Sequence, residues 1–320
     1  MLFEDIKYLM KYIVKIYKKF IKTYNWKNIL IIFAVILLVK KLYDECKPKI
    51  ENFTSFQSEK FLIKKGNEVY DEFYCSLYDE LVLDPVKNKF EYDEIKKATN
   101  MNKKSNVLDV GCGTGHHVND FNKNGIKCIG VDKSQSMINK CREKYNGKNY
   151  KRGDILTTIM FQPSSFTHIT CLYFTIYSIE DKLSAFKNFY DWLKPGGYLI
   201  LNLVNRDKFD PIVDAGNPLL MVSPQKYAKK RITNTVVKFN DFQYKSNFEQ
   251  NTGENIAYFK ETFQHDSDGK VRKNEHILHM DTQKDILGTA KNVGFILKGK
   301  IDMVYCMYEY QYLYVLYKPN

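Results

Sequence analysis

Residues 107–118 contain the feature that most constrains the fold, a glycine-rich loop between an apolar run and a helix-like pattern. The segment reads Val-Leu-Asp-Val-Gly-Cys-Gly-Thr-Gly-His-His-Val, so three glycines alternate with other residues directly after a short strand-like run. Glycine permits turns and close backbone approaches that a Cβ atom would prevent. A strand that leads through such a loop into a helix is typical of an open parallel sheet with a ligand site at its carboxyl edge.

Further strand-like segments follow, at intervals that leave room for helices between them. Residues 128–132 read Cys-Ile-Gly-Val-Asp, and the next segment places Asp154 after Arg-Gly. Residues 168–174 and 198–204 are two more apolar runs, and Leu193–Gly197 indicates the end of a helix before the second of them. This alternation of strands and helices predicts a doubly wound α/β fold with a parallel sheet.

The order and spacing of these segments resemble class I methyltransferases that depend on S-adenosylmethionine (SAM), of the small-molecule type 11 or 25. Asp-x-Gly-x-Gly-x-Gly, then Val-Asp, Gly-Asp-Ile and Leu-Lys-Pro-Gly-Gly carry the resemblance over roughly residues 100–205. The resemblance implies a Rossmann-like, seven-stranded methyltransferase sheet. It also implies that SAM is the cofactor and that no metal takes part.

The resemblance assigns a role to each matching position. Asp132 would accept hydrogen bonds from the ribose hydroxyls, and Asp154 from the adenine amino group. Asp109 would orient the loop and reach the methionine ammonium group of SAM. The backbone of the loop would lie against the methionine and the ribose. The expected cofactor contacts are Asp109, Gly111, Cys112, Gly113, Asp132, Met137, Asp154, Ile155 and Leu172.

A nicotinamide-dependent dehydrogenase is the alternative that the same kind of loop suggests. Dehydrogenases also carry an acidic residue after the second strand. Their loop follows the pattern Gly-x-Gly-x-x-Gly, because a pyrophosphate binds at the helix N-terminus. Gly115 comes one residue too early for that pattern, and SAM has no phosphate. The spacing therefore favours SAM.

Helical and strand-like segments surround this core on both sides. Tyr70, Tyr74 and Tyr78 recur at helical spacing in residues 66–82 and predict a helix that covers the cofactor site. Residues 206–281 form an insertion, in which 242–248, 256–263 and 271–280 are predicted strands of a small antiparallel substrate-side sheet. A helix at 281–293 and strands at 295–304 and 310–317 complete the core, the last strand antiparallel. The expected divisions are 1–45 (anchor), 46–100 (linker and lid), 101–205 (core), 206–281 (insertion) and 282–320 (end of the core sheet).

No single residue is predicted to be catalytic, because methyl transfer depends mainly on alignment and a dry site. A general base can assist when the acceptor is a hydroxyl or ammonium group. Three histidines of the insertion are candidates, whereas His116 and His117 are expected to open a helix and His168 to be structural. The candidates are His265, His276 and His279.

The N-terminal segment is expected to attach the chain to a membrane. Residues 29–39 are an unbroken apolar run, and the stretch Tyr24–Tyr43 is long enough for a single-pass transmembrane helix. Lysines and apolar residues in residues 1–22 recur on opposite faces of a basic amphipathic helix. A helical hairpin packed on the soluble domain and a cleaved signal peptide are the alternatives. The catalytic domain is expected on the cytosolic side.

Charge and cysteine content bear on the partner of the enzyme. Residues 1–50 hold 11 lysines and four acidic residues, a net charge of +7, so residues 51–320 hold only +5 of the total of +12. This distribution favours a lipid surface over a nucleic acid. The seven scattered cysteines suggest a reducing compartment.

The acceptor is expected to be a small molecule, lipid or glycan. A tethered protein or RNA methyltransferase and a non-catalytic scaffold stay as alternatives.

Overall fold

The computed structural model describes residues 26–45, 59–147, 149–216, 223–251 and 253–320. Its internal contacts divide the chain into two units, Met1–Glu51 and Asn52–Asn320. The described part of the first unit is one helix, α2 (Trp26–Glu45). The amphipathic helix expected at residues 1–22 lies outside the described residues.

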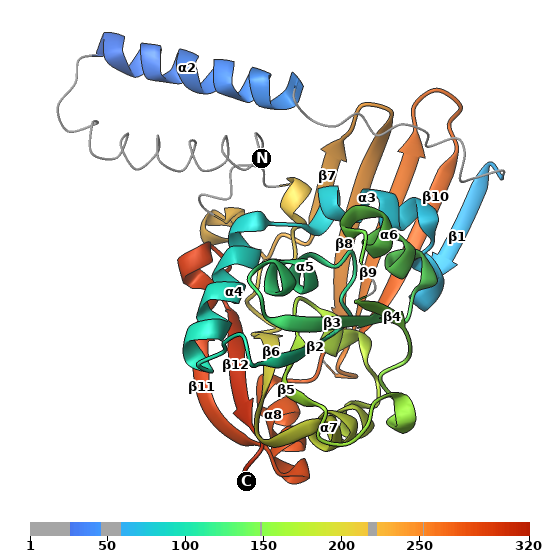
Figure 1. Ribbon diagram of the computed structural model, residues 1–320. Coiled ribbons are helices and arrows are strands. Elements are labelled where there is room, and N and C mark those ends of the chain that lie inside the picture. Colours follow the sequence, from blue (N-terminus) through green and yellow to red (C-terminus); the bar gives the residue numbers. More distant parts are fainter. Residues whose placement is uncertain (1–25, 46–58, 148, 217–222, 252) are drawn as a thin grey trace. The chain divides into compact units, whose positions relative to one another are not determined.

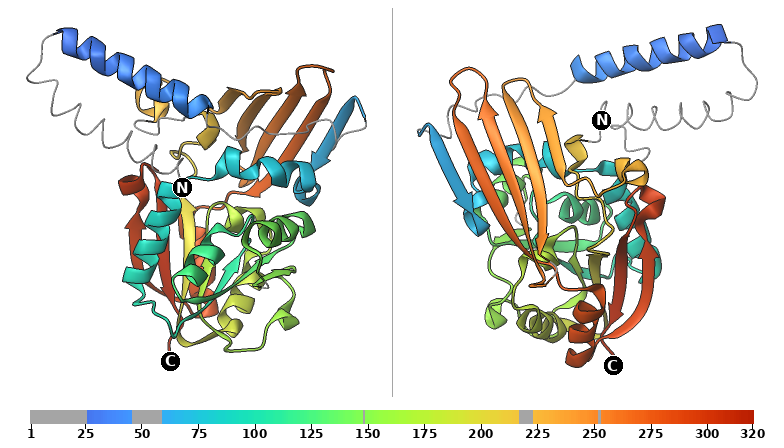
Figure 2. Two further views of the ribbon diagram at one scale, coloured as in Figure 1. Left: turned by 45° about the horizontal axis from the view of Figure 1, so that its top comes forward. Right: turned by 180° about the vertical axis from the view of Figure 1, so that it is seen from behind.

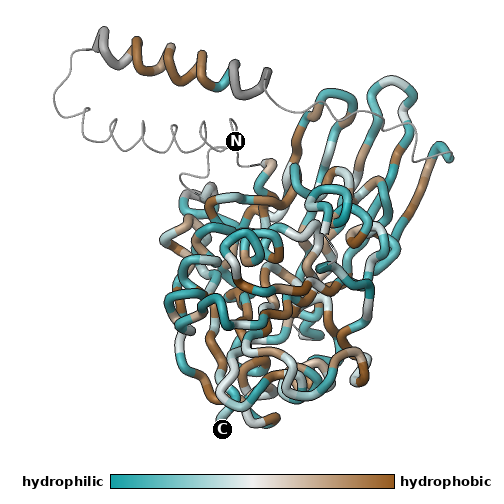
Figure 3. The backbone as a smooth tube through the Cα atoms, in the orientation of Figure 1, coloured by the Kyte–Doolittle hydropathy of each residue, from teal (hydrophilic) through white to brown (hydrophobic). Residues whose placement is uncertain are grey.

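Helix α2 covers most of the segment that the sequence predicts to cross a membrane. Figure 3 shows an apolar stretch in the middle of this helix. Within the described ranges, however, no helix is both long enough and apolar enough to cross a bilayer. Lys27, Lys40 and Lys41 interrupt the apolar character near the two ends of α2. The expectation of a transmembrane helix at Tyr24–Tyr43 is therefore not supported.

Seven strands of the second unit form one sheet in the order β11-β12-β6-β5-β2-β3-β4 (Figure 1). Strands β2 to β6 are parallel, and β12 is antiparallel to β6 and to β11. The predicted Rossmann-like, seven-stranded α/β core is thus confirmed, including the reversed last strand. The segment Leu193–Gly197 begins β6 and does not end a helix, because α7 already stops at Trp192. The strands are β2 (Asn106–Val110), β3 (Lys127–Asp132), β4 (Tyr150–Arg152), β5 (Phe166–Cys171), β6 (Leu193–Val204), β11 (Ile296–Asp302) and β12 (Gln311–Tyr317).

Helices cover both faces of this sheet. Successive side chains of a strand point to opposite faces, so Val107 and Leu108 are both fully buried but belong to different apolar clusters. Leu108 shares its cluster with residues of α7 and α8, and Val107 shares its cluster with residues of α4, α5 and α6. The helices of this unit are α3 (Glu72–Val82), α4 (Pro85–Ala98), α5 (His116–Lys123), α6 (Gln135–Tyr145), α7 (Lys182–Trp192) and α8 (Gln283–Val293).

The insertion and β1 together form a second sheet of five strands in the order β1-β10-β9-β8-β7 (Figure 2). The three strands that the sequence predicts for it are confirmed as β8, β9 and β10. Two strands were not predicted, namely β7 and β1. Strand β1 precedes the core in sequence, yet it pairs in parallel with β10, with Phe61 opposite Val271. The strands are β1 (Phe61–Lys65), β7 (Asn234–Lys238), β8 (Phe242–Asn251), β9 (Ile256–His265) and β10 (Val271–His279).

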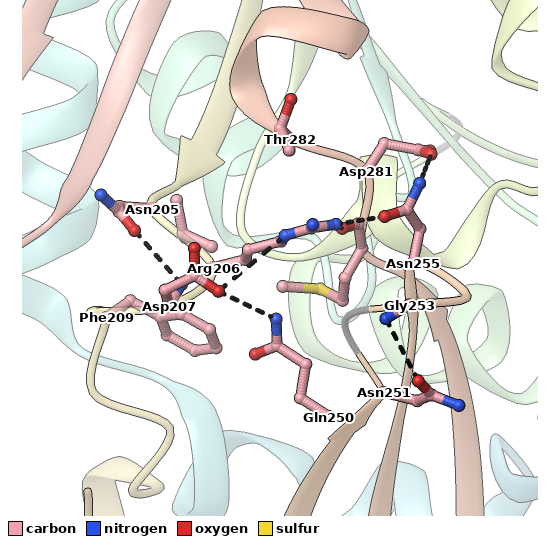
Figure 4. Close-up of polar contacts among 12 residues, drawn as sticks. Asn205, Arg206, Asp207, Phe209, Gln250, Asn251, Gly253, Asn255, Asp281 and Thr282 are labelled. Carbon is pink, nitrogen blue, oxygen red and sulfur yellow. Dashed lines mark hydrogen bonds and ion pairs between the residues drawn. The ribbon is translucent and has the colours of Figure 1, made fainter.

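The insertion leaves the core and returns to it at one polar junction (Figure 4). Arg206 follows β6, and its guanidinium donates hydrogen bonds to the Met280 carbonyl (2.6 Å) and to the side chain of Asn255. The Asn255 amide in turn donates to Asp281, which follows β10 (3.5 Å). These contacts join the first residue of the insertion to its last and so position the second sheet as a roof over the core.

Candidate functional site

A cavity of about 800 Å³ lies at the carboxyl ends of the parallel strands. Every residue that the sequence predicts to contact the cofactor lines this cavity. All but Met137 come from the ends of four strands and the turns that follow them, as the switch-point rule for open α/β sheets requires, and Met137 comes from the first turn of α6. They are Asp109, Gly111, Cys112, Gly113, Asp132, Met137, Asp154, Ile155 and Leu172.

The glycine loop after β2 has a backbone that other residues rarely adopt. Gly111 and Gly113 have φ angles of +65° and +52°. A Cβ atom at Gly111 would lie 2.4 Å from the Thr175 side chain, which is too close for any substitution without displacement. A Cβ atom at Gly113 would meet only the ring of Tyr78, at 3.6 Å. Gly113 therefore keeps cavity space open, whereas Gly111 permits close packing of the loop on Thr175.

Asp132, at the end of β3, is held by the glycine loop itself. Its Oδ2 atom accepts the Gly113 N–H at 3.0 Å, and its Oδ1 atom accepts the Ser134 N–H at 2.8 Å. Burial raises the pKa of Asp132 to about 6, although these backbone hydrogen bonds oppose the shift. The carboxylate is therefore ionised at neutral pH and is placed in the cavity wall.

The other two predicted carboxylates have contrasting surroundings. Asp109 is 3% exposed, accepts a hydrogen bond from the Thr170 hydroxyl at 2.6 Å, and has its pKa raised by burial. Asp154 lies nearer the surface and forms an ion pair with Lys133 at 2.9 Å. Burial alone would raise the pKa of Asp154, but its hydrogen bonds with Lys133 and Leu156 lower it overall.

Two of the three tyrosines predicted near the site reach the cavity. Tyr70 and Tyr78 line it, and burial raises the pKa of both hydroxyls. Tyr74 does not line the cavity, because its hydroxyl donates to the buried Glu261 at 3.1 Å. The helix expected over residues 66–82 is a 3-10 turn (Gly66–Val69) followed by α3, so Tyr70 covers the cavity from the link before α3 and Tyr78 from α3 itself. Tyr74 fixes α3 to the roof.

A buried polar network in the roof could not be anticipated from the sequence. Glu261 is 2% exposed and accepts hydrogen bonds from Tyr74, from Tyr244 (2.8 Å) and from His276 (2.8 Å). Arg272, 1% exposed, pairs with Asp71 at 2.8 Å. Asp71 is the N-cap of α3. The network therefore attaches α3, the helix that we call the lid, to β9 and β10.

Of the three candidate histidines in the insertion, His279 lines the cavity. Lys182 holds it there by donating to the His279 carbonyl at 3.0 Å while pairing with Asp281 at 2.8 Å. Burial lowers the pKa of His279, and the charge of Lys182 lowers it further. His276 is engaged with Glu261, and His265 bonds Asp268 in the β9–β10 turn at 2.7 Å.

The histidines after the glycine loop differ in part from expectation. Helix α5 does begin at His116, as predicted. His117, however, lines the cavity and contacts the fully buried Glu91 at 2.8 Å, so its role is not limited to opening the helix. His168 is buried in β5, and burial lowers its pKa to about 4, which fits the expected structural role.

Comparison with known proteins places this geometry among methyltransferases. The family model described as "Methyltransferase domain" matches residues 108–201. Carboxy-S-adenosyl-L-methionine synthase of Glaesserella parasuis serovar 5 (strain SH0165) is 27% identical over 156 residues, which cover 43% of this chain and 62% of that protein. Phosphoethanolamine N-methyltransferase 1 of Zea mays is 34% identical over 116 residues, covering 34% of this chain and 22% of that protein. The chain thus spans less than two thirds of the length of either relative.

Solved structures share the fold over most of the chain. The SAM-bound structure of CalS10, an amino pentose methyltransferase from Micromonospora echinaspora, gives a TM-score of 0.55 at 18% identity and covers 78% of this chain and 98% of its own. A SAM-dependent methyltransferase from Clostridium acetobutylicum ATCC 824 gives 0.58 at 18% identity, with 77% and 98% covered. At these identities the likeness shows the fold. Together with the match over residues 108–201, it shows that the chain contains a SAM-dependent methyltransferase domain.

Proposed function

We propose that the chain transfers the methyl group of SAM to an amino or hydroxyl group of a small molecule. The observation that carries the proposal is that one cavity brings the expected cofactor contacts together with residues of the lid and the roof. Tyr78 of α3 and His279 of β10 line the same space as Gly113 and Asp132. An acceptor enclosed between the roof and the glycine loop is protected from water, which favours methyl transfer.

The residues of the cavity fit the cofactor. When bound, SAM supplies a methyl group on a positively charged sulfur. Asp132 is ionised at neutral pH and keeps lone pairs for the two ribose hydroxyls beyond those used by Gly113 and Ser134. Met137 and Ile155 supply apolar walls for the adenine, and Asp154 lies at the same end. Asp154 accepts from Lys133 and from the Leu156 N–H, and its carboxylate keeps lone pairs for the adenine amino group.

Three observations support a small acceptor over a protein or an RNA. The lid and the roof restrict the space over the loop to one cavity of about 800 Å³. Residues 51–320 lack the strong positive charge that nucleic-acid enzymes concentrate on their catalytic domain. By their names, two of the proteins described above act on phosphoethanolamine and on an amino pentose, which are both small amines.

His279 is the residue we assign as proton acceptor. An attacking amine or hydroxyl gains a methyl group and must lose one proton. A neutral imidazole can take that proton, and the lowered pKa of His279 keeps its ring neutral at pH 7. Lys182 acts as a positioning residue, because it fixes the backbone of His279.

The test is transfer of isotope-labelled methyl from SAM to a metabolite extract by the purified full-length chain. We expect a labelled low-molecular-weight product and one S-adenosylhomocysteine per methyl transferred. The Asp132→Ala variant should give much less of both at the same SAM concentration. Label found only in protein or RNA would replace this proposal with the macromolecular alternative, and SAM binding without transfer to any fraction would favour the scaffold.

We also propose that residues 1–45 attach the enzyme to a membrane, with the methyltransferase domain on the cytosolic side. Helix α2 exposes large apolar side chains, including Leu30, Phe33 and Leu38, each more than half exposed. Eleven lysines in residues 1–50 suit an anionic lipid surface. We expect the full chain to sediment with vesicles that contain anionic lipid, and the chain without residues 1–45 to stay in solution. Sedimentation of both forms, or of neither, would contradict the proposal.

A further inference from the structure

The positions of Asp132 and Asp154 fix the orientation in which SAM would lie in the cavity. Asp154 follows β4 and Asp132 ends β3, so the adenine and the ribose occupy that side of the sheet in the proposed function. Strand β2 is the next neighbour of β3. The methionyl end of SAM must therefore extend past the end of β2. Residues that line the cavity there are Asp109, His117 and Asn88, the last two from α5 and α4.

His117 and Glu91 form a buried pair at this end. The Nε2 atom of His117 lies 2.8 Å from Oε2 of Glu91, and the two side chains are 7% and 0% exposed. Burial alone would lower the pKa of His117, but the hydrogen bond and charge of Glu91 raise it, with Asp109 and Asp120 adding to the shift. The Glu91 carboxylate therefore favours the form of the ring that carries a proton on both nitrogens. In this form Nε2–H donates to Glu91, and Nδ1–H is the donor that can bind a ligand.

Asn88 offers a second donor beside this ring. Its side-chain oxygen accepts a hydrogen bond from the Tyr173 hydroxyl. The amide N–H groups are thus the part of Asn88 that can serve a ligand. The ring of Tyr173 also packs edge-on against His117, with centroids 6.0 Å apart. Tyr173 therefore helps to fix both donors, and its own backbone is unusual, with φ at +51° directly after Leu172.

The methionyl end of SAM carries an ammonium group and a carboxylate group, and these need opposite partners. The carboxylate of Asp109 suits the ammonium group. An anion beside Asp109 and Glu91 would be repelled unless a cation lies between them. We propose that the His117–Glu91 pair, together with Asn88, is the subsite for the carboxylate of SAM, with His117 as its cationic donor. This inference rests on the proposed function and names a recognition residue for its cofactor.

Calorimetry with truncated ligands tests the subsite on the full chain. SAM carries the carboxylate, decarboxylated SAM keeps the ammonium group alone, and 5′-methylthioadenosine lacks both. The loss of a hydrogen bond to a charged group lowers the affinity for a ligand about tenfold to a hundredfold. We expect the wild type to bind SAM about that much more tightly than decarboxylated SAM. The His117→Gln variant should lose this preference and bind 5′-methylthioadenosine as the wild type does.

The neighbouring His116 provides a matched control. Its ring is already engaged by Asp79 and Tyr145 at the cavity rim. We expect His116→Gln to keep the preference for SAM. Equal weakening of all three ligands by His117→Gln, or an unchanged preference, would overturn the inference and leave the proposed function intact. A wild-type chain that binds none of the three ligands would instead refute the proposed function.

A pH titration of the wild type gives a second test that needs no variant to fold. The charged groups that face His117 are Glu91 on α4, Asp109 on β2 and Asp120 on α5. The preference for SAM over decarboxylated SAM should fall as the pH rises through the raised pKa of His117. A preference that does not fall at any higher pH at which the chain stays folded would contradict the assignment of His117 as the cation.

Discussion

Replacement of Asp132 by asparagine should change cofactor affinity and protein stability in opposite directions. We propose that the ribose hydroxyls of SAM donate hydrogen bonds to the charged carboxylate of Asp132. Hydrogen bonds to a charged group contribute about 1.5–3 kcal/mol, so Asp132→Asn should weaken SAM binding about tenfold to a hundredfold. The same charge is costly in the absence of the cofactor, because it is buried without a cationic partner among its main contacts.

The cost of that charge follows from the pKa shift. The pKa of Asp132 rises from 3.8 to about 6. At about 1.4 kcal/mol per pKa unit, this corresponds to roughly 3 kcal/mol of lost stability at pH 7. Asparagine removes the charge but replaces one acceptor oxygen with a donor, which should cost about 1–2 kcal/mol at the Gly113 or Ser134 N–H. The cofactor-free variant should therefore be more stable than the wild type by about 1–2 kcal/mol.

Urea denaturation measures the change in unfolding free energy, and calorimetry measures the change in SAM affinity, both at pH 7.5. The control is Asp93→Asn, because Asp93 forms an exposed ion pair with Lys89. The sign of the pH dependence gives a further check. A carboxyl group with a raised pKa in the folded state makes the cofactor-free protein less stable as the pH rises from about 4 to about 6. SAM affinity should fall below pH 6, where Asp132 becomes protonated. A variant that is less stable than the wild type and binds SAM equally well would refute the reasoning.

The remaining predictions concern the loop, the base and the roof. Gly113→Val places a branched side chain at a φ of +52° in the cavity, so SAM binding should be lost while the unfolding free energy falls by only about 1–2 kcal/mol; normal binding would place the loop elsewhere. His279→Gln should lower kcat about a hundredfold or more in steady-state assays with unchanged SAM affinity; an unchanged kcat would remove His279 from the mechanism. Lys182→Met removes the cationic partner of the half-buried Asp281 and should cost about 1–3 kcal/mol in urea denaturation; Lys187→Met, on the same helix, is the control.

The sequence was sufficient to predict the part of the site that depends on local patterns. Asp109, Asp132 and Asp154 each follow a strand, and parallel strands bring their carboxyl ends to one edge. Their meeting in one cavity therefore required only the correct order of strands. The glycine loop was equally readable, because its special backbone requires a residue without a Cβ atom.

The rest of the site depends on contacts between residues far apart in the chain. Nothing in residues 61–65 shows that they pair with β10, since the partner is more than 200 residues away. Glu91 looks like a surface residue of an amphipathic helix, and only packing of α4 on α5 makes it a buried partner of His117. Lys182 is 6% exposed for the same reason, because the end of β10 covers it. Such buried polar pairs have no local sequence signal.

The most direct test of the account is a crystal structure of the chain with S-adenosylhomocysteine bound. The account predicts the ribose hydroxyls on Asp132, the adenine between Met137 and Ile155, and the methionyl end beside Asp109 and His117. The thioether sulfur should point into the space between the glycine loop and His279. A nucleoside bound elsewhere on the molecule, or bound in the reverse direction along the carboxylates, would contradict the central claim.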